Sequence, residues 1–132
     1  MIRSHGLSHI QIAVRDLERS VRFYKAVFGL RDKFVGSGSA AFLTTPGAHD
    51  IITLNQAGDP ERAGQSGGIA HFGFHVDGMA DFEAAVARAG EAGGKVIRRG
   101  IRRTDECPEE PWAFLADPDG YIVEVYCPTP GS

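Results

Sequence analysis

The sequence is poor in cysteine, and the two cysteines that it has, Cys107 and Cys127, stand far apart. Their separation matches neither a zinc-binding nor a redox motif, and two cysteines do not build a disulfide scaffold. Reduced thiols in a cytoplasmic protein are therefore expected.

Long apolar segments and an excess of one charge are absent as well. No apolar run approaches the roughly 20 residues of a membrane helix, and the N-terminus has no signal-peptide pattern. Lys and Arg number 14 against 17 Asp and Glu, so the formal net charge is −3. This balance argues against nucleic acid and anionic membranes as partners. The length predicts a single domain over residues 1–132.

An internal repeat is the main positive feature. Two short segments with alternating apolar residues, 7–14 (LSHIQIAV) and 69–76 (IAHFGFHV), predict half-buried strands of one design. His9 and His71 hold the same place in the two segments, 62 residues apart. Further along, Phe42 aligns with Phe114 and Thr53 with Glu124. The pattern indicates two copies of one module.

Each first strand is followed by a helical pattern. Asp16 predicts the N-cap of a helix over Leu17–Phe28, and Gly29 predicts its left-handed end. The expected apolar stripe of this helix is Leu17, Val21, Tyr24 and Phe28. The corresponding helix of the second copy is expected over residues 80–90.

Three more strands are predicted in each copy, at 33–35, Ala40–Thr44 and 50–55, and at 95–98, 112–116 and 121–126. Residues 117–120 (DPDG) predict a tight turn, and the charged, proline-bearing residues 102–111 predict a mobile loop. Residues 57–68, rich in Gly, Pro and charge, indicate a linker. The prediction is an α+β fold of two βαβββ modules, about 5–56 and 69–128. Their strands are expected to pair into one cupped, mainly antiparallel sheet with both helices outside.

Three stretches of the chain resemble the signatures of the vicinal oxygen chelate superfamily: LSHIQIAVRDLERSVRFYKAVFGL, GGIAHFGFHV and DPDGYIVEVY. That family includes glyoxalase I, extradiol dioxygenases, fosfomycin-resistance transferases and bleomycin-resistance proteins. The resemblance implies the fold more strongly than the reaction, because one fold hosts many chemistries. It also implies a homodimer with possible module exchange, since family members of this size commonly build each cup from two chains.

The resemblance places metal ligands at His9, His71 and Glu124. The residues themselves support this, because a carboxylate between Val123 and Val125 would be costly in a core strand without a partner. Two imidazoles and one carboxylate form a facial triad with open positions. We expect one divalent metal ion, with Fe(II) favoured and Mn(II), Zn(II) and Ni(II) as alternatives.

Three further residues are candidates for catalytic roles. His75 faces the expected cup, where pocket lining and plain packing are equally open. Tyr126 shares its strand face with Glu124. His49 precedes the fourth strand, near the place where extradiol dioxygenases carry an acid–base histidine. Its register differs by one residue, which favours an exposed turn histidine instead.

Four residues are candidates for substrate binding. Gln11 faces the cup, where pocket lining and plain packing remain equally open. Trp112 and Phe114 share a strand face and suggest an apolar wall for an aromatic substrate. Arg102 is a candidate for an anionic group, with a solvated loop as the alternative.

The predicted function is that of a metal-dependent enzyme acting on a small molecule with two adjacent oxygens. A dioxygenase-like (extradiol) or lyase reaction is favoured. A non-catalytic, bleomycin-resistance-like binding protein is the first alternative, and a glyoxalase-type isomerase or lyase the second. Thr53 stands where glyoxalase I and its relatives place a further ligand, which counts against that reaction. The tail after Glu124 lacks the basic residues that fosfomycin transferases use to hold a phosphonate.

Overall fold

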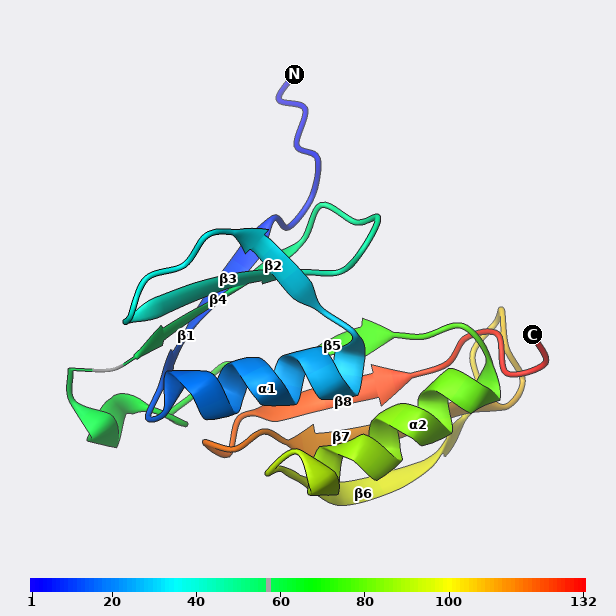
Figure 1. The fold of residues 1–132 in the computed structure, drawn as a ribbon. Coiled ribbons are helices and arrows are strands. Elements are labelled where there is room, and N and C mark those ends of the chain that lie inside the picture. The colour runs from blue at the N-terminus through cyan, green and yellow to red at the C-terminus, as the bar shows by residue number, and fades with distance from the viewer. Residues whose placement is uncertain (57) are drawn as a thin grey trace.

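The computed structural model describes residues 1–56 and 58–132, and it has the predicted α+β fold of two βαβββ modules. The first module consists of β1 (His9–Val14), α1 (Leu17–Phe28), β2 (Arg31–Phe34), β3 (Ala40–Thr44) and β4 (Ile51–Gln56). The second consists of β5 (Phe72–His75), α2 (Gly78–Glu91), β6 (Lys95–Arg102), β7 (Glu110–Ala116) and β8 (Ile122–Tyr126). The N-terminal residues extend away from the body of the protein (Figure 1). No helix in the described part of the chain has the length and apolar character to cross a membrane.

The strands form two four-stranded sheets, one for each module, with the same order: β1-β4-β3-β2 and β5-β8-β7-β6. In each sheet the first pair is parallel and the other two pairs are antiparallel. The expected single sheet is therefore corrected to two, because no backbone ladder joins β1 to β5 among the described residues. Both of these strands lie at a sheet edge.

Strand register confirms the internal repeat. Gln11 lies opposite Thr53 in the first sheet, and Gly73 lies opposite Glu124 in the second. On the other side, Thr53 pairs with Phe42 and Glu124 pairs with Phe114. The two modules thus have the same strand pairing in the part of each sheet that the sequence pattern singled out.

Helix α1 has the predicted ends but a shifted buried face. The Asp16 side chain accepts a hydrogen bond from the backbone N–H of Arg19, and Gly29 closes the helix at a φ of 68°. The buried residues are Leu17, Ser20, Phe23, Tyr24 and Val27. Val21 and Phe28 of the predicted stripe are half-buried and pack against the edge of the core. Phe28 lies at the rim of the core because its ring stacks on Phe74 of the second module, with centroids 4.3 Å apart.

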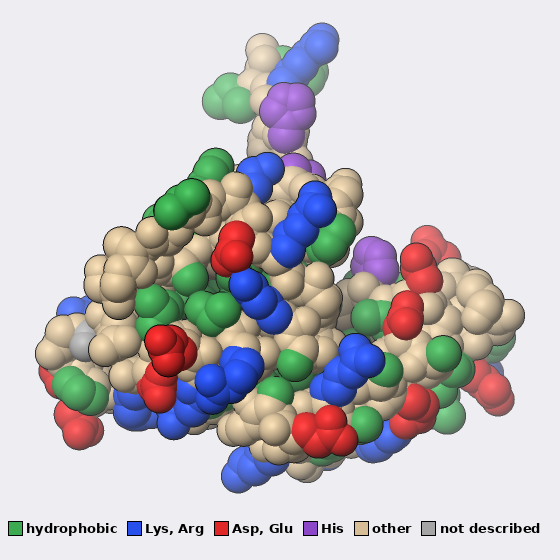
Figure 2. All heavy atoms as spheres, in the orientation of Figure 1, with side chains coloured by type: hydrophobic (Ala, Val, Ile, Leu, Met, Phe, Trp, Pro, Cys, Tyr) green, Lys and Arg blue, Asp and Glu red, His purple; other side chains and the backbone are tan. Residues whose placement is uncertain are grey.

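The modules share one core, which α1 and α2 build together against the two sheets (Figure 1). The predicted turn at 117–120 docks on α1 through two buried aspartates. Tyr24 Oη donates to Asp117 Oδ2 at 2.7 Å, and Asp119 accepts hydrogen bonds from Arg15, Arg19 and Ser20. The outer face that carries both helices intersperses Lys and Arg with Asp and Glu (Figure 2).

Two connecting segments are more ordered than the sequence predicts. The predicted loop at 102–111 is shorter, because β6 continues to Arg102 and β7 begins at Glu110. The predicted linker begins at residue 57, which lies outside the described residues, and its described part, 58–68, contains a 3-10 turn, Pro60–Arg62, followed by the buried Ala63. The carbonyl of Ala63 accepts a hydrogen bond from the Arg15 guanidinium at 2.8 Å, which ties this segment to the end of β1.

Candidate metal and substrate site

One face of the second sheet gathers most of the predicted site residues. Side chains of directly paired strand residues point to the same side of a sheet. The pairing therefore defines a cup face, which lies opposite the helices and includes Gly73, His75, Arg98, Gly100, Arg102, Glu110, Trp112, Phe114, Glu124 and Tyr126. The alternate residues Leu115, Val123 and Val125 are fully buried in the core.

His71 and Glu124 meet beside this face. Nε2 of His71 lies 3.3 Å from Oε1 of Glu124, and the ring of His71 packs edge-on against Phe114 with centroids 4.9 Å apart. The Glu124 side chain is 9% exposed and that of His71 38% exposed. Two donor atoms that each lie about 2.1 Å from one ion are at most about 4.2 Å apart, so this pair fits a shared metal.

The second oxygen of Glu124 lies beside Arg102. Arg102 Nη1 lies 2.8 Å from Oε2 of Glu124 and forms an ion pair with it, at angles that are poor for a hydrogen bond. Buried carboxylate oxygens are normally satisfied by donors or metals. The imidazole and carboxylate donors of His71 and Glu124 thus fit a bound cation, and at Oε2 that cation would compete with Arg102.

Arg102 is shared between two buried glutamates. Its Nε donates to Glu110, which is 5% exposed, while its guanidinium also contacts Glu124 and lies over the Tyr126 ring at 5.1 Å. Burial opposes the charge on Arg102, but the contacts with the two glutamates outweigh it and raise its pKa. The expectation of a solvated loop at Arg102 is wrong, because this residue ends β6.

His9 does not join the pair within the chain. It begins β1, its Nδ1 lies 2.8 Å from Ser8 Oγ, and it lines a cavity of about 140 Å³ whose other wall includes Gly73. Among the described residues, no three His, Cys, Asp or Glu side chains form a group able to hold a metal. The structure thus brings together two of the three predicted ligands.

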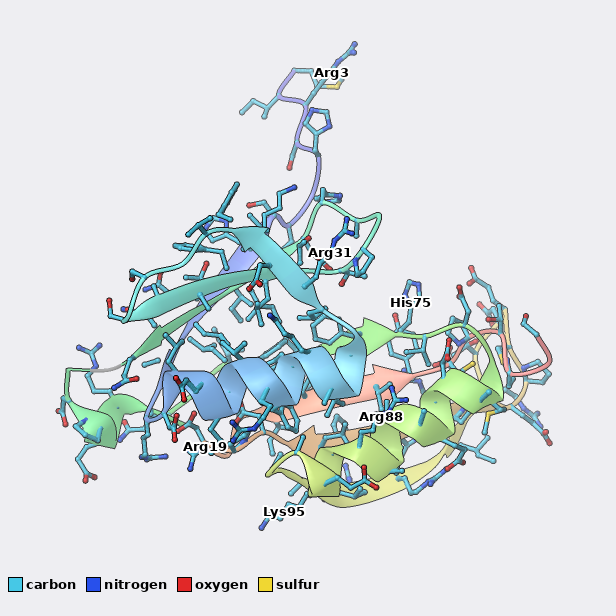
Figure 3. The ribbon with its side chains drawn as sticks, viewed as in Figure 1. Arg3, Arg19, Arg31, His75, Arg88 and Lys95 are labelled. Carbon is cyan, nitrogen blue, oxygen red and sulfur yellow. The ribbon has the colours of Figure 1, made fainter. Side chains whose placement is uncertain are left out.

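Of the remaining predicted residues, Gln11 and His75 lie on the same side of the protein as His71 and Glu124, whereas His49 lies apart from them. Gln11 and His71 both line a cavity of about 310 Å³. His75 projects from the end of β5 away from α2 (Figure 3), and its ring centroid lies 5.8 Å from that of Tyr126. His49 is exposed between β3 and β4, with no polar contact to the pair among the described residues.

The two aromatic rings proposed as a substrate wall lie next to each other. The Trp112 and Phe114 rings lie 5.2 Å apart, and the Trp112 ring covers Gly100 on the neighbouring strand. A Cβ at Gly100 would stand 2.8 Å from the indole, so glycine is required for this packing.

Two residues of the cup face were missed by sequence reasoning. Glu110 is two residues before Trp112 and therefore lies on the same face of β7 as Trp112 and Phe114. The neighbouring prolines and charges made this segment look like a loop and hid the pattern. Arg98 lies over both rings, at 5.5 Å from the Trp112 centroid and 5.3 Å from the Phe114 centroid. No periodicity could have found it, because the strand is irregular at this point.

Comparison with known proteins gives relatives with different chemistries. The chain is 34% identical over 119 residues to a probable trivalent organoarsenical cleaving enzyme of Bacillus subtilis (strain 168), covering 89% of this chain and 77% of the relative. It is 30% identical over 139 residues to catechol-2,3-dioxygenase of the same organism, covering 100% of this chain but only 46% of the relative.

A glyoxalase/bleomycin resistance protein from Albidiferax ferrireducens T118 has a similar fold, with a TM-score of 0.74 and 24% identity, covering 92% of this chain and 98% of the other. The family model described as Glyoxalase/Bleomycin resistance protein/Dioxygenase superfamily matches residues 6–125. The fold and its internal repeat agree with this match: the chain belongs to the glyoxalase/bleomycin resistance protein/dioxygenase superfamily.

Proposed function

We propose that the protein is a divalent-metal-dependent enzyme that acts on a small molecule with two adjacent oxygens, by an extradiol dioxygenase type of reaction. One observation carries the proposal: His71 Nε2 and Glu124 Oε1 lie 3.3 Å apart beside a face walled by aromatic rings, and the Glu124 side chain is only 9% exposed. The relationship to catechol-2,3-dioxygenase supports the reaction type.

His9, His71 and Glu124 would hold the ion, with Fe(II) favoured and Mn(II), Zn(II) or Ni(II) as alternatives. The bound metal would chelate both oxygens of the substrate and act as a Lewis acid. The Trp112 and Phe114 rings would hold an aromatic ring flat beside the ion. His75 and Tyr126 are the neighbouring groups suited to accept or donate a proton.

His9 would come from a second copy of the chain. Within one chain it lies apart from His71 and Glu124, and both β1 and β5 have unpaired outer edges among the described residues. Edge strands offer backbone groups for pairing with another chain. A two-fold symmetric homodimer would place His9 of each chain beside the cup face of its partner.

One observation favours the non-catalytic alternative, a small-molecule binding protein. Arg102 already supplies a positive charge to Glu124 at 2.8 Å, as a metal-free cup would require. The glyoxalase-type reaction has less support, because Thr53 stands in the place that Glu124 holds in the second module.

The test is the metal content of protein purified without chelator. Wild type should bind one divalent ion per site, and His71→Ala should bind none while remaining folded. His5→Ala removes an exposed histidine of the N-terminal segment and serves as the matched control. Wild type that binds no divalent ion on titration would contradict the metalloenzyme and favour the binding protein.

A further inference from the structure

We propose that Arg98, above the rings of Trp112 and Phe114, is a subsite for a carboxylate of the substrate. The inference rests on the proposed function and narrows its substrate class to aryl carboxylates with two adjacent hydroxyls. Three observations carry it: the irregularity of β6 that aims Arg98, the absence of a competing anion, and the distance from Glu124.

A β-bulge places Arg98 on the cup face. Val96 pairs with Leu115, a fully buried core residue, whereas Arg98 pairs with Phe114 on the cup face. In a regular strand residues 96 and 98 would share one face. The register shift between them therefore turns Arg98 from the core side to the cup side, as bulges beside functional sites commonly do.

The first module has the same shift, between Asp32 and Phe34. There the residue after the bulge is Phe34, which pairs with Phe42 as Arg98 pairs with Phe114. The bulge thus belongs to the repeated module, whereas the cation at this point occurs in the second module alone.

Arg98 has no anionic partner among the residues that the structure describes. Its two cationic neighbours differ: Arg99 pairs with Glu83 on the opposite face, and Arg102 is shared by Glu110 and Glu124. A guanidinium stacked on rings keeps its N–H edge available, and this edge matches a carboxylate with two parallel hydrogen bonds.

The spacing sets the size of the substrate. Phe114 is paired with Glu124 on one side and with Arg98 on the other. Neighbouring strands are about 4.8 Å apart, so the backbones of Glu124 and Arg98 are roughly 10 Å apart across Phe114. One aromatic ring beside Phe114 spans this gap, with its two hydroxyls toward Glu124 and a short carboxylate side chain toward Arg98.

The experiment measures binding to Zn(II)-loaded protein by calorimetry, because zinc has no redox chemistry that would consume the ligand. The probes are 3,4-dihydroxyphenylacetate and 4-methylcatechol, which share the ring and the adjacent hydroxyls but differ in the carboxylate. Wild type should bind the carboxylate probe at least about tenfold more tightly. Arg98→Gln should abolish this preference and leave 4-methylcatechol unchanged, and Arg99→Gln, on the opposite face, should behave as wild type.

Equal binding of the two probes by wild type, or a preference that survives in Arg98→Gln, would overturn the subsite. Failure of the metalloenzyme proposal has a different signature, since neither hydroxylated probe would then bind better with zinc than without. Phenylacetate, which has the ring and carboxylate but no hydroxyls, tests the subsite in metal-free protein by NMR titration. Wild type should bind it about tenfold more tightly than Arg98→Gln, and equal affinities would refute the subsite whatever the metal result.

Discussion

Gly73 lies directly opposite Glu124 in the parallel pair of β5 and β8, and no larger residue fits there. A Cβ at Gly73 would stand 2.9 Å from the carbonyl oxygen of Glu124 and 3.1 Å from its Cβ. The equivalent residue of the first module, Gln11, lies opposite Thr53 without this restriction. The missing side chain of Gly73 on β5 thus leaves the space that the Glu124 side chain on β8 occupies.

Gly73→Ala should therefore weaken metal binding by displacing Glu124 from His71. We expect unfolding free energy to fall by about 1–3 kcal/mol, the usual cost of overpacking, and metal affinity to fall by tenfold or more. Calorimetric titration and urea unfolding measure the two effects. Gly38→Ala, at a loop glycine with no atom near an added Cβ, should change neither quantity. Unchanged metal affinity in Gly73→Ala would argue against Glu124 as a ligand.

Arg102 should compete with the metal for Glu124. In Arg102→Gln the buried Glu110 and Glu124 both lose their cation, so the metal-free protein should become less stable by about 1–2 kcal/mol, a figure reduced for the partial exposure of Arg102. In Arg102→Gln a divalent ion at Glu124 would replace the missing positive charge, whereas in wild type it must displace Arg102. Metal should therefore bind Arg102→Gln about tenfold more tightly than wild type.

Glu110→Gln should have the opposite effect on metal affinity. With Glu110 neutral, Arg102 is left to Glu124 alone, and the metal must displace it. We expect weaker metal binding than in wild type, measured by the same titration. Shifts of both variants in one direction would show that Arg102 does not compete with the ion.

Tyr24 should govern stability at high pH. Burial first, and then the charge and hydrogen bond of Asp117, raise the pKa of Tyr24 well above 10. Above pH 10 the unfolded chain loses the phenolic proton while the folded protein keeps it, so stability falls as pH rises, by up to about 1.4 kcal/mol per pH unit. Tyr24→Phe lacks this loss but leaves Asp117 without one donor, at a cost of about 1–3 kcal/mol near pH 7. Urea unfolding from pH 7 to 11 should show the gap between the two proteins narrowing above pH 10, and a constant gap would refute the assignment.

The repeat made much of the fold predictable. Equivalent residues 62 apart anticipated the shared register, and the cap and end residues of α1 located that helix to the residue. Glu124 was recognisable because a charge within a core strand needs a partner. The repeat, the helix ends and the charge at Glu124 can each be read from a short stretch of sequence, so no knowledge of tertiary contacts was needed to predict them.

Other features depend on tertiary contacts that alternation does not record. The bulge in β6 inverts the side-chain alternation, which hid Arg98 from any period-2 analysis. Phe28 carries a helical apolar pattern, but its partner is Phe74 of the other module. The contact of Arg102 with two glutamates from different strands cannot be inferred from a charged segment.

The last prediction concerns which chains share a site. Each cup face carries His71 and Glu124 from one module, while His9 belongs to the other. If His9 comes from the partner, mixing His9→Ala chains with Glu124→Ala chains regenerates one intact site in each mixed dimer, although neither variant binds metal alone. Random exchange makes about half of the dimers mixed, so about a quarter of wild-type metal binding should return. His71→Ala mixed with Glu124→Ala is the control, because both changes lie in the same module and every cup face stays broken. Recovery in the first mixture but not in the second requires sites shared between chains, whereas no recovery in either places His9, His71 and Glu124 of a site in one chain.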